Sequence, residues 1–517
     1  MRKLEILKNV GSSWVSLGVN IILGLFLSPF ILHRLGDDAF GIWSLIFAIT
    51  GYYGIFDLGI RSSVIRYVSK LTAVEDREGL ARFFNTSLAT YTCIGLAATF
   101  VTLLGSPFVG SLFPKIPPNF LPTAHWLFLM VGLSVALGFP LGIFAGILEG
   151  LERFYLLNFT NVVALLLRAV LTIVALSRGY GLLTVGLITV LLPLLSSVAR
   201  AILVFRILPI PIGWKYVDRS VFGEMANYSG VTFVIQVAYK LRFKTDVVII
   251  GKYLGSAAIT KFSIGGRLVD YASEVVSGLA QVFLPMSSQS DAKGDVARLR
   301  KIFVAGNRAC ALVILPITAI LIVLGKSVIE AWVGRKYVAG SYPVMLVLLI
   351  PTTLILMQNA TPRIIYGMAK HRTLAWITSI EALANLILSI VLVRRIGVIG
   401  DAIGTAVPLS FTALYFTPRY LSRLLGVRVW TFLREAYVLP LALCTPLVAV
   451  LLAMQRWFPV HRLIPLASEI VIAMLIYGVG LLWAVRTRRV YEVGDLASQE
   501  LIAAETTELA ESLTEQV

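Results

Sequence analysis

The amino-acid sequence predicts an all-α integral membrane protein that crosses the bilayer about fourteen times. Of its 517 residues, 58% are hydrophobic and only 14% are charged, whereas charged residues make up about 25% of an average soluble domain. Apolar runs of about 20 residues, the length of a helix that spans a bilayer, recur along the chain. Because a helix satisfies its own backbone hydrogen-bonding groups in lipid, we expect each run to be helical.

The predicted spans follow one another with short connections. They lie near 11–32, 40–60, 83–105, 124–147, 157–176, 181–205, 225–250, 258–287, 303–325, 340–362, 374–393, 399–418, 436–455 and 463–485. Lys and Arg favour the cytoplasmic side of a membrane, and most of them fall in segments that are cytoplasmic if the N-terminus is inside. Both termini are therefore predicted to be cytoplasmic. The formal net charge of +17 then reflects topology, and it does not imply nucleic-acid binding.

Sequence signals for catalysis are missing. The four histidines are scattered without metal-ligand spacing, and the three cysteines fall inside predicted spans, where thiols behave as small hydrophobes. No nucleotide-binding fingerprint is present. We therefore expect no enzyme, no bound metal and no cofactor.

An internal repeat is visible when the second half of the chain is laid on the first. LGDDAFGIWSL, from Leu35, aligns with LGSAAITKFSI, from Leu254, and AVEDREGLARFF, from Ala73, aligns with AKGDVARLRKIF, from Ala292, at the same shift and without a gap. In the later part of each copy, GLERFYLLNF resembles GMAKHRTLAW at a slightly smaller shift. Positions related by these shifts are called equivalent below.

The repeat predicts the symmetry of the fold. Six helices per copy is an even number, so both copies enter the membrane from the same side. We therefore expect two six-helix lobes related by a pseudo-two-fold axis along the membrane normal, followed by two extra helices. The predicted domains are an N-terminal lobe at 1–205, a cytoplasmic linker at 206–224, a C-terminal lobe at 225–424, the two extra helices at 425–489 and an acidic cytoplasmic tail at 490–517.

Three cations and one acid lie inside the seventh predicted span. QVAYKLRFKTDVVIIGKYLG, from Gln236, contains Lys240, Arg242, Lys244 and Asp246. A charge at the bilayer centre costs roughly 2.5–3.5 kcal/mol. The equivalent positions of the first copy are Ile21, Leu23, Leu25 and Leu27. The fold does not need these charges, so a binding site is favoured over a structural pair.

Helical periodicity divides these four residues between two faces. Lys240 and Lys244 share one face, and Arg242 and Asp246 share nearly the opposite one. We expect the lysines to point into a wet cavity while Arg242 pairs with Asp246 against a neighbour, although the reverse assignment is open.

Other charged residues in predicted spans extend the candidate site. Arg168, Lys261 and Arg267 are further cations for an anionic substrate. The carboxylates that could bind coupling protons or cations are Asp246, Asp270, Glu274 and Glu381. Arg267, Asp270 and Glu274 line one helical stripe. At the inner end of the second span, Arg61 and Arg66 could receive a phosphate at the cytoplasmic entrance, and Arg61 could also pair with Asp57.

The fourth span carries small residues at a four-residue period. They are Gly138, Gly142, Gly146 and Gly150. Such a stripe lets another helix approach closely, so we expect it to pack against a neighbouring helix; a hinge for rocking motion is the alternative.

The N-terminal sequence resembles a known family. SLGVNIILGLFLSPFILHRLGDDAFGIWSL, from Ser16, and GYYGIFDLGIRSSVIRYVSK, from Gly51, are similar to the Wzx-type polysaccharide flippases of the multidrug/oligosaccharidyl-lipid/polysaccharide exporter superfamily. The plan of six, six and two helices agrees over the whole chain. The resemblance implies two lobes around a central cavity that move a polyprenyl-pyrophosphate-linked oligosaccharide to the outer leaflet of a bacterial cytoplasmic membrane. It also implies polysaccharide polymerase and assembly proteins as partners.

The cations suit that substrate, because a pyrophosphate needs groups that replace its water. The expected mechanism is alternating access around a cationic cavity, with coupling to an H⁺ or Na⁺ gradient or to the membrane potential. One alternative is a cation-coupled multidrug exporter of the same superfamily, whose cavity would hold mainly acids and aromatic residues. Less favoured alternatives are a polytopic glycosyltransferase or polymerase, which would need a larger outer loop, and a non-transporting scaffold.

Overall fold

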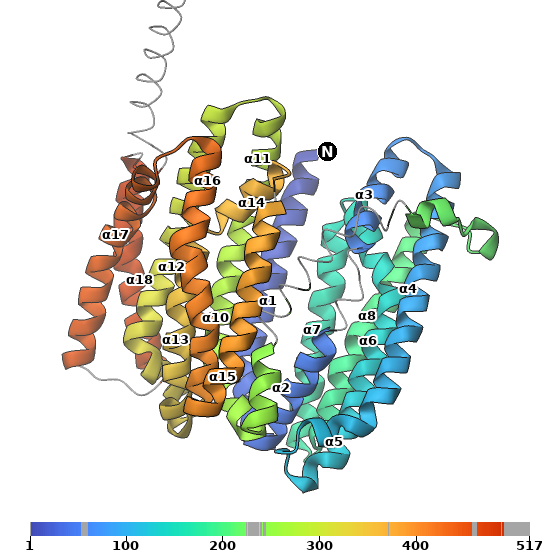
Figure 1. The fold of residues 1–517 in the computed structure, drawn as a ribbon, viewed down its shortest axis with the longest axis horizontal. Helices are drawn as coiled ribbons and strands as arrows, with labels where there is room; N and C mark the ends of the chain where they lie inside the picture. Colours follow the sequence, from blue (N-terminus) through green and yellow to red (C-terminus); the bar gives the residue numbers. More distant parts are fainter. Residues whose placement is uncertain are drawn as a thin grey trace, which may run out of the picture. The chain divides into compact units, whose positions relative to one another are not determined.

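A computed structural model describes residues 2–52, 60–223, 225, 237, 240, 245–370, 372–457, 463–487 and 489–490. Within these residues every regular element is a helix, which confirms the all-α fold class (Figure 1). The α-helices are α1 (Arg2–Leu35), α2 (Asp37–Gly51), α3 (Ile60–Ala73), α4 (Arg77–Gly105), α5 (Val109–Leu112), α6 (Leu121–Gly150), α7 (Phe154–Ser177), α8 (Leu182–Ile207), α10 (Ser256–Ala280), α11 (Phe283–Ala292), α12 (Val296–Val333), α13 (Val338–Met357), α14 (Ala360–Gly367), α15 (Arg372–Phe411), α16 (Thr417–Leu425), α17 (Val429–Trp457) and α18 (Leu463–Arg486). Residues 245–253 are also helical.

The described part of the chain contains ten helices that are long and apolar enough to cross a membrane. The protein is therefore a multi-span membrane protein, and the count of fourteen spans stays a prediction. The predicted span 258–287 is divided between α10 and α11. The predicted spans 374–393 and 399–418 both fall mainly in α15, which is interrupted where Gly397 adopts a φ of 67°, a conformation that glycine accepts without steric cost.

The chain forms two compact units. Unit 1 comprises Met1–Ile264 and Thr378–Thr405, and unit 2 comprises Gly265–Ile377 and Ala406–Val517. This division differs from the predicted lobes because residues 225–264 and most of α15 belong to unit 1. The predicted domain boundaries stay a prediction.

Aromatic side chains fill the interior of unit 1 between α3, α4, α6 and α8. The rings of Phe84 and Phe205 both contact Phe144, at centroid distances of 5.9 and 5.4 Å. Tyr67 of α3 stacks on Phe83 of α4 at 4.8 Å. Such aromatic pairs stabilise beyond the area they bury, so these rings fix how the four helices pack.

The predicted linker packs onto α4. Asn85 is buried, and its side chain donates to the Pro211 carbonyl and accepts from the Gly213 amide, both at 2.9 Å. The amide of Asp218 donates to Thr86 Oγ1 at 2.9 Å. The Ser220 hydroxyl also donates to Asp218, and this bond holds the pKa of that carboxyl below its usual range. These bonds pair buried polar groups of α4 with the linker backbone.

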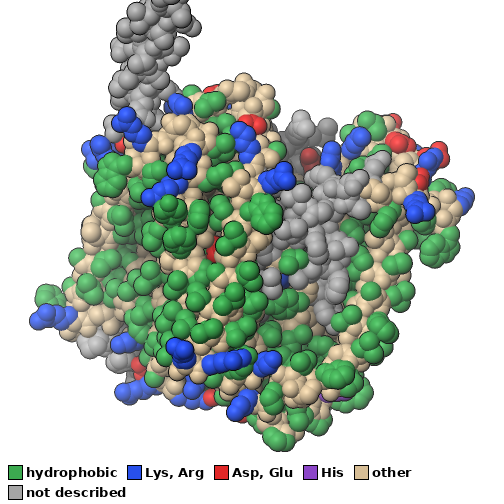
Figure 2. Space-filling view, in the orientation of Figure 1, with side chains coloured by type: hydrophobic (Ala, Val, Ile, Leu, Met, Phe, Trp, Pro, Cys, Tyr) green, Lys and Arg blue, Asp and Glu red, His purple; other side chains and the backbone are tan. Residues whose placement is uncertain are grey.

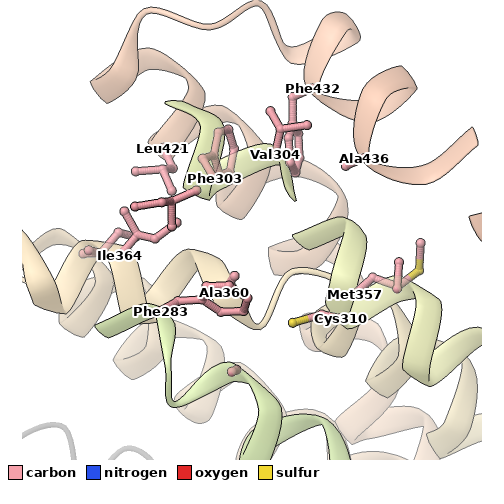
Figure 3. Packing of buried hydrophobic residues seen from close by; sticks show 14 of the residues in the cluster. Phe283, Phe303, Val304, Cys310, Met357, Ala360, Ile364, Leu421, Phe432 and Ala436 are labelled. Carbon is pink, nitrogen blue, oxygen red and sulfur yellow. The ribbon is translucent and has the colours of Figure 1, made fainter. Parts of the chain in front are cut away.

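Unit 2 is built around α12. Phe303 of α12 stacks on Phe432 of α17 at 4.2 Å, inside the cluster that Figure 3 shows. Arg308 of α12 is only 2% exposed, and its guanidinium donates to Glu435 and to the carbonyls of Arg489 and Val490. The equivalent position in the first copy of the repeat is Ala89. Arg308 therefore binds α17 and the segment after α18 to α12, and the first copy of the repeat has no arginine at the equivalent position.

Backbone features recur at equivalent positions of the repeat. Gly36 and its equivalent Gly255 have φ angles of 83° and 97°. Glu75 and its equivalent Gly294 have φ angles of 54° and 65°. In the later part of each copy, where the shift is slightly smaller, the equivalent residues Glu152 and Ala369 have φ angles of 57° and 56°. The same local turns therefore recur at corresponding points, while the symmetry of whole lobes stays a prediction.

Two of these corresponding turns contact each other inside unit 1. Thr260 Oγ1 donates to the Asp37 carbonyl at 2.6 Å, and a Cβ at Gly41 would overlap the Ser256 carbonyl. Gly41 is equivalent to Thr260 in the repeat, and Asp37 is equivalent to Ser256. The two contacts therefore join the same two positions of the repeat, with the roles of the first and second copy interchanged. The Ser256 hydroxyl also donates to the Asp38 carboxylate.

Hydrophobic side chains cover much of the outer flanks of the helices. Figure 2 shows them along the helices of the visible face, with Lys and Arg side chains gathered toward helix ends. Large exposed examples include Phe100, Leu171 and Val479. Exposed apolar flanks with charged ends are the pattern expected of helices that face lipid.

Candidate functional site

The predicted cations lie in both units. Lys240 is helical and half-buried, Arg168 on α7 is half-buried, and Lys261 on α10 is exposed; all three belong to unit 1. Arg267, also on α10, is exposed and belongs to unit 2. Arg242 and Lys244 lie outside the described residues. That these cations share one hydrated volume stays a prediction.

The predicted coupling carboxylates separate into two kinds. Asp246 and Glu381, both in unit 1, are each only 5% exposed. On α10, Asp270 is exposed and Glu274 is half-buried. Burial therefore sets Asp246 and Glu381 apart from the two carboxylates of α10.

Asp246 is held in a polar network that joins three segments of unit 1. Thr405 Oγ1 donates to Asp246 Oδ1 at 3.0 Å, and Asn385 Nδ2 donates to Thr405 Oγ1 at 3.0 Å. Next to Asp246, the hydroxyls of Thr245 and Tyr52 are 2.5 Å apart. The predicted pairing of Asp246 with Arg242 cannot be compared with this arrangement, since Arg242 lies outside the described residues.

Asp401 is a second buried carboxylate in the same network. It lies one helical turn before Thr405 and is completely buried, and Asp246 is the neighbouring charge that acts on it. Its carbonyl accepts from Ser389 Oγ at 3.2 Å. Among the described residues, neither carboxylate oxygen of Asp401 has a hydrogen-bond partner. Burial and a second carboxylate nearby both disfavour the charged form of a carboxylate, so this pair is a candidate site for a proton or a monovalent cation.

Sequence reasoning did not single out Asp401. The residue lies near the start of the predicted span 399–418, where an acid is an ordinary feature of a helix N-terminus. The available signal was its spacing, one helical turn from Thr405 in an otherwise apolar stretch. In the part of the chain that the structure describes, no three His, Cys, Asp or Glu side chains gather as a metal site.

The predicted entrance residue Arg61 forms a two-point ion pair with Glu149. Its Nη2 lies 2.6 Å from Glu149 Oε1, and its Nε lies 3.4 Å from Oε2. Asp57, the partner expected from the sequence, lies outside the described residues. Arg66 lies over the ring of Tyr67, 5.9 Å from its centroid.

A further arginine adjoins this pair. The guanidinium of Arg200, on α8, donates to the side chains of Thr160, Asn161 and Ser196. Arg61 and Glu149 are the charged groups that act on it. Sequence reasoning missed Arg200 because it lies near the inner end of a predicted span, where basic residues commonly set topology.

Comparisons with known proteins place the chain among polysaccharide-related membrane proteins. A family model described as polysaccharide biosynthesis protein matches residues 31–341. The membrane protein EpsK of Bacillus subtilis (strain 168) is 22% identical over 436 residues, which cover 82% of this chain and 85% of EpsK. A putative O-antigen transporter of Shigella flexneri is 21% identical over 428 residues, covering 80% of this chain and 96% of that protein.

A solved structure shares the fold. The lipid II flippase MurJ, in an inward closed conformation, superimposes with a TM-score of 0.71 at 16% identity, covering 94% of this chain and all of MurJ (100%). At this identity the likeness concerns the fold alone.

Proposed function

Because this chain belongs to the polysaccharide biosynthesis protein family, we propose that it is a flippase for a lipid-linked oligosaccharide. It would carry a polyprenyl-pyrophosphate-linked oligosaccharide from the cytoplasmic to the outer leaflet of a bacterial cytoplasmic membrane, for cell-surface polysaccharide synthesis. The observation that carries this proposal is the relation to a putative O-antigen transporter over 96% of that protein's length. The fold shared with a lipid II flippase supports it.

The chemistry of the substrate agrees with the charged residues of the spans. A pyrophosphate needs cations to replace its water, and Arg and Lys supply them as a planar fork and a point charge. Lys240 and Arg168 of unit 1 are half-buried and are the proposed contacts in the membrane region. We retain Arg242, Lys244, Lys261 and Arg267 as further proposed contacts. In this mechanism the prenyl chain stays in lipid while the head group passes the cations by alternating access.

We propose that Asp246 and Asp401 bind the coupling ion. Both are buried, and Thr405 reaches Asp246 from the helix that carries Asp401. A proton or Na⁺ taken up here would neutralise one of two neighbouring carboxylates. Membrane ionisable residues commonly form such relays.

The proposed activity is transport rather than catalysis, since the similar proteins are a putative O-antigen transporter and a lipid II flippase. The nearest alternative, a multidrug exporter, shares the superfamily but would act on free amphiphilic cations. We further propose that both termini are cytoplasmic and that polysaccharide polymerase and assembly proteins are partners.

The test is flipping in proteoliposomes of a fluorescent polyprenyl-pyrophosphate oligosaccharide, measured as its accessibility to a membrane-impermeant quencher. Movement in vesicles with the protein and none in empty vesicles is expected. Export of a cationic dye without movement of the glycolipid would favour the multidrug exporter.

A further inference from the structure

Arg200 is a half-buried positive charge near the ion pair of Arg61 and Glu149. Arg200 makes all its hydrogen bonds to neutral groups: Thr160 Oγ1 at 2.9 Å, Asn161 Oδ1 at 2.5 Å and Ser196 Oγ at 2.8 Å. Among the described residues no acidic side chain lies within ion-pair distance of Arg200. The described residues contribute Arg61, Arg200 and Glu149 to this cluster, and a charge withdrawn from water favours an oppositely charged partner.

The orientation of Arg200 is set before any ligand arrives. Its Nε and Nη2 are engaged by groups of α7 and α8 that are buried or half-buried. In the described part of the chain its Nη1 makes no hydrogen bond. An arginine held on one edge by neutral acceptors, with donors remaining on the other, is suited to bind a phosphate oxygen.

Access to the cluster is through Arg61. The side chain of Arg61 is 49% exposed, and that of Glu149 is 14% exposed. Arg61 lies in the first turn of α3, a helix found toward the same end of unit 1 as the N-terminus (Figure 1). The contact between Asn9 of α1 and the Glu152 carbonyl, at 2.7 Å, places the start of α1 beside the end of α6. This is the end predicted to be cytoplasmic, where the substrate would enter.

Polar groups continue from the cluster onto α1. Asn158 Nδ2 lies 3.0 Å from both Ser12 Oγ and Ser13 Oγ, and Asn158 precedes Thr160 and Asn161 on α7. Hydroxyl and amide groups of this kind suit the first sugar of a glycan, next to guanidinium groups that suit a diphosphate.

We propose that Arg200 and Arg61 form a docking site for the diphosphate of the lipid-linked substrate, with Glu149 as the internal counter-ion that the diphosphate replaces. The proposal rests on the proposed function. It adds Arg200 to the substrate contacts, and it adds the replacement of Glu149 by the diphosphate as the counter-ion of the arginines. A diphosphate brings at least two negative charges, so it can compensate both arginines, whereas Glu149 carries a single negative charge.

Equilibrium binding of farnesyl pyrophosphate to the full-length protein in detergent tests this site. Arg200→Gln removes the charge, and we expect it to weaken binding about tenfold or more, the loss of a charge-assisted hydrogen bond. Glu149→Gln removes the competing carboxylate, and we expect it to tighten binding. Arg178→Gln, at an exposed position after α7, is the matched control and should bind as the wild type does. Farnesol, which lacks the diphosphate, should bind all four proteins equally.

A loss of affinity for farnesyl pyrophosphate in Arg200→Gln and a gain in Glu149→Gln would support the site. A merely structural cluster gives no reason for Glu149→Gln to increase this affinity. Weaker or unchanged binding by Glu149→Gln would overturn the proposal, as would an equal loss of farnesol binding by Arg200→Gln. If Arg200→Gln fails to fold, the change in affinity caused by Glu149→Gln decides the question alone. Binding is measured without flipping, so failure of the proposed function in vesicles would be seen separately.

Discussion

Asp76 and Asp295 occupy equivalent positions of the repeat, and each caps a long helix in the same way. The Asp76 carboxylate accepts from the Gly79 amide at the start of α4, and the Asp295 carboxylate accepts from the Arg298 amide at the start of α12, both at 2.8 Å. In each case the preceding residue, Glu75 or Gly294, has a positive φ. A turn and its cap have therefore been kept together in both copies of the repeat.

Removing either cap should destabilise the protein. We expect Asp76→Ala and Asp295→Ala each to lower the free energy of unfolding by about 1 kcal/mol, because a backbone amide at the helix start loses its acceptor. Thermal unfolding in one detergent measures this, with Asp291→Ala, an exposed acid that does not cap α12, as the control. Equal stability of the cap variants and the control would contradict the capping role.

The glycines of α6 should differ in how much an added methyl group destabilises the protein. A Cβ at Gly146 would lie 2.9 Å from Val64 Cγ1, and one at Gly150 would lie 2.9 Å from the Ile65 carbonyl, whereas Gly138 and Gly142 have nothing within 4 Å. We expect Gly150→Ala to destabilise by about 1–3 kcal/mol through overpacking against α3. Gly138→Ala should be neutral or slightly stabilising, because alanine favours helix over glycine.

Thermal unfolding of alanine variants at all four glycines decides this point. Similar losses at every position would mean that the stripe acts through backbone flexibility, the hinge alternative, and not through close packing of α6 on α3.

The buried carboxylates should carry the response to an ion gradient. In vesicles, we expect Asp401→Asn to abolish the acceleration of flipping by an imposed H⁺ or Na⁺ gradient, because one of the two charges that attract the ion is lost. Asp270→Asn, at an exposed position, should keep the full acceleration. Separate H⁺ and Na⁺ gradients identify the ion. A response that survives in Asp401→Asn but is lost in Asp270→Asn would place coupling on α10 instead.

The parts of the fold that sequence reasoning predicted are those that depend on few residue types. Hydrophobic run length predicts helices, and positions such as Gly36 and Gly255 keep glycine where φ is positive. The repeat was therefore visible from the sequence. The break at Gly397 agrees with the boundary predicted between 374–393 and 399–418.

The site was predicted less completely, because it depends on which helices meet. Spacing places Asp270 and Glu274 on one stripe but does not say that α10 leaves Asp270 exposed while Asp246 is buried. Asp401 and Arg200 each looked ordinary near the end of a predicted span. Their environments come from partners distant in the sequence, such as Thr405 reaching Asp246 and Asn161 binding Arg200.

The most direct test of the central claim is flipping of a labelled polyprenyl-pyrophosphate oligosaccharide by the wild type beside Lys240→Ala/Lys244→Ala. We expect the wild type to move the lipid and the double variant to move it at least about tenfold more slowly, since two charged contacts to the pyrophosphate are lost. Circular dichroism and thermal unfolding confirm that the variant is folded. Equal rates would contradict the assignment of these lysines to the substrate, and no movement by the wild type across several glycans would contradict the flippase.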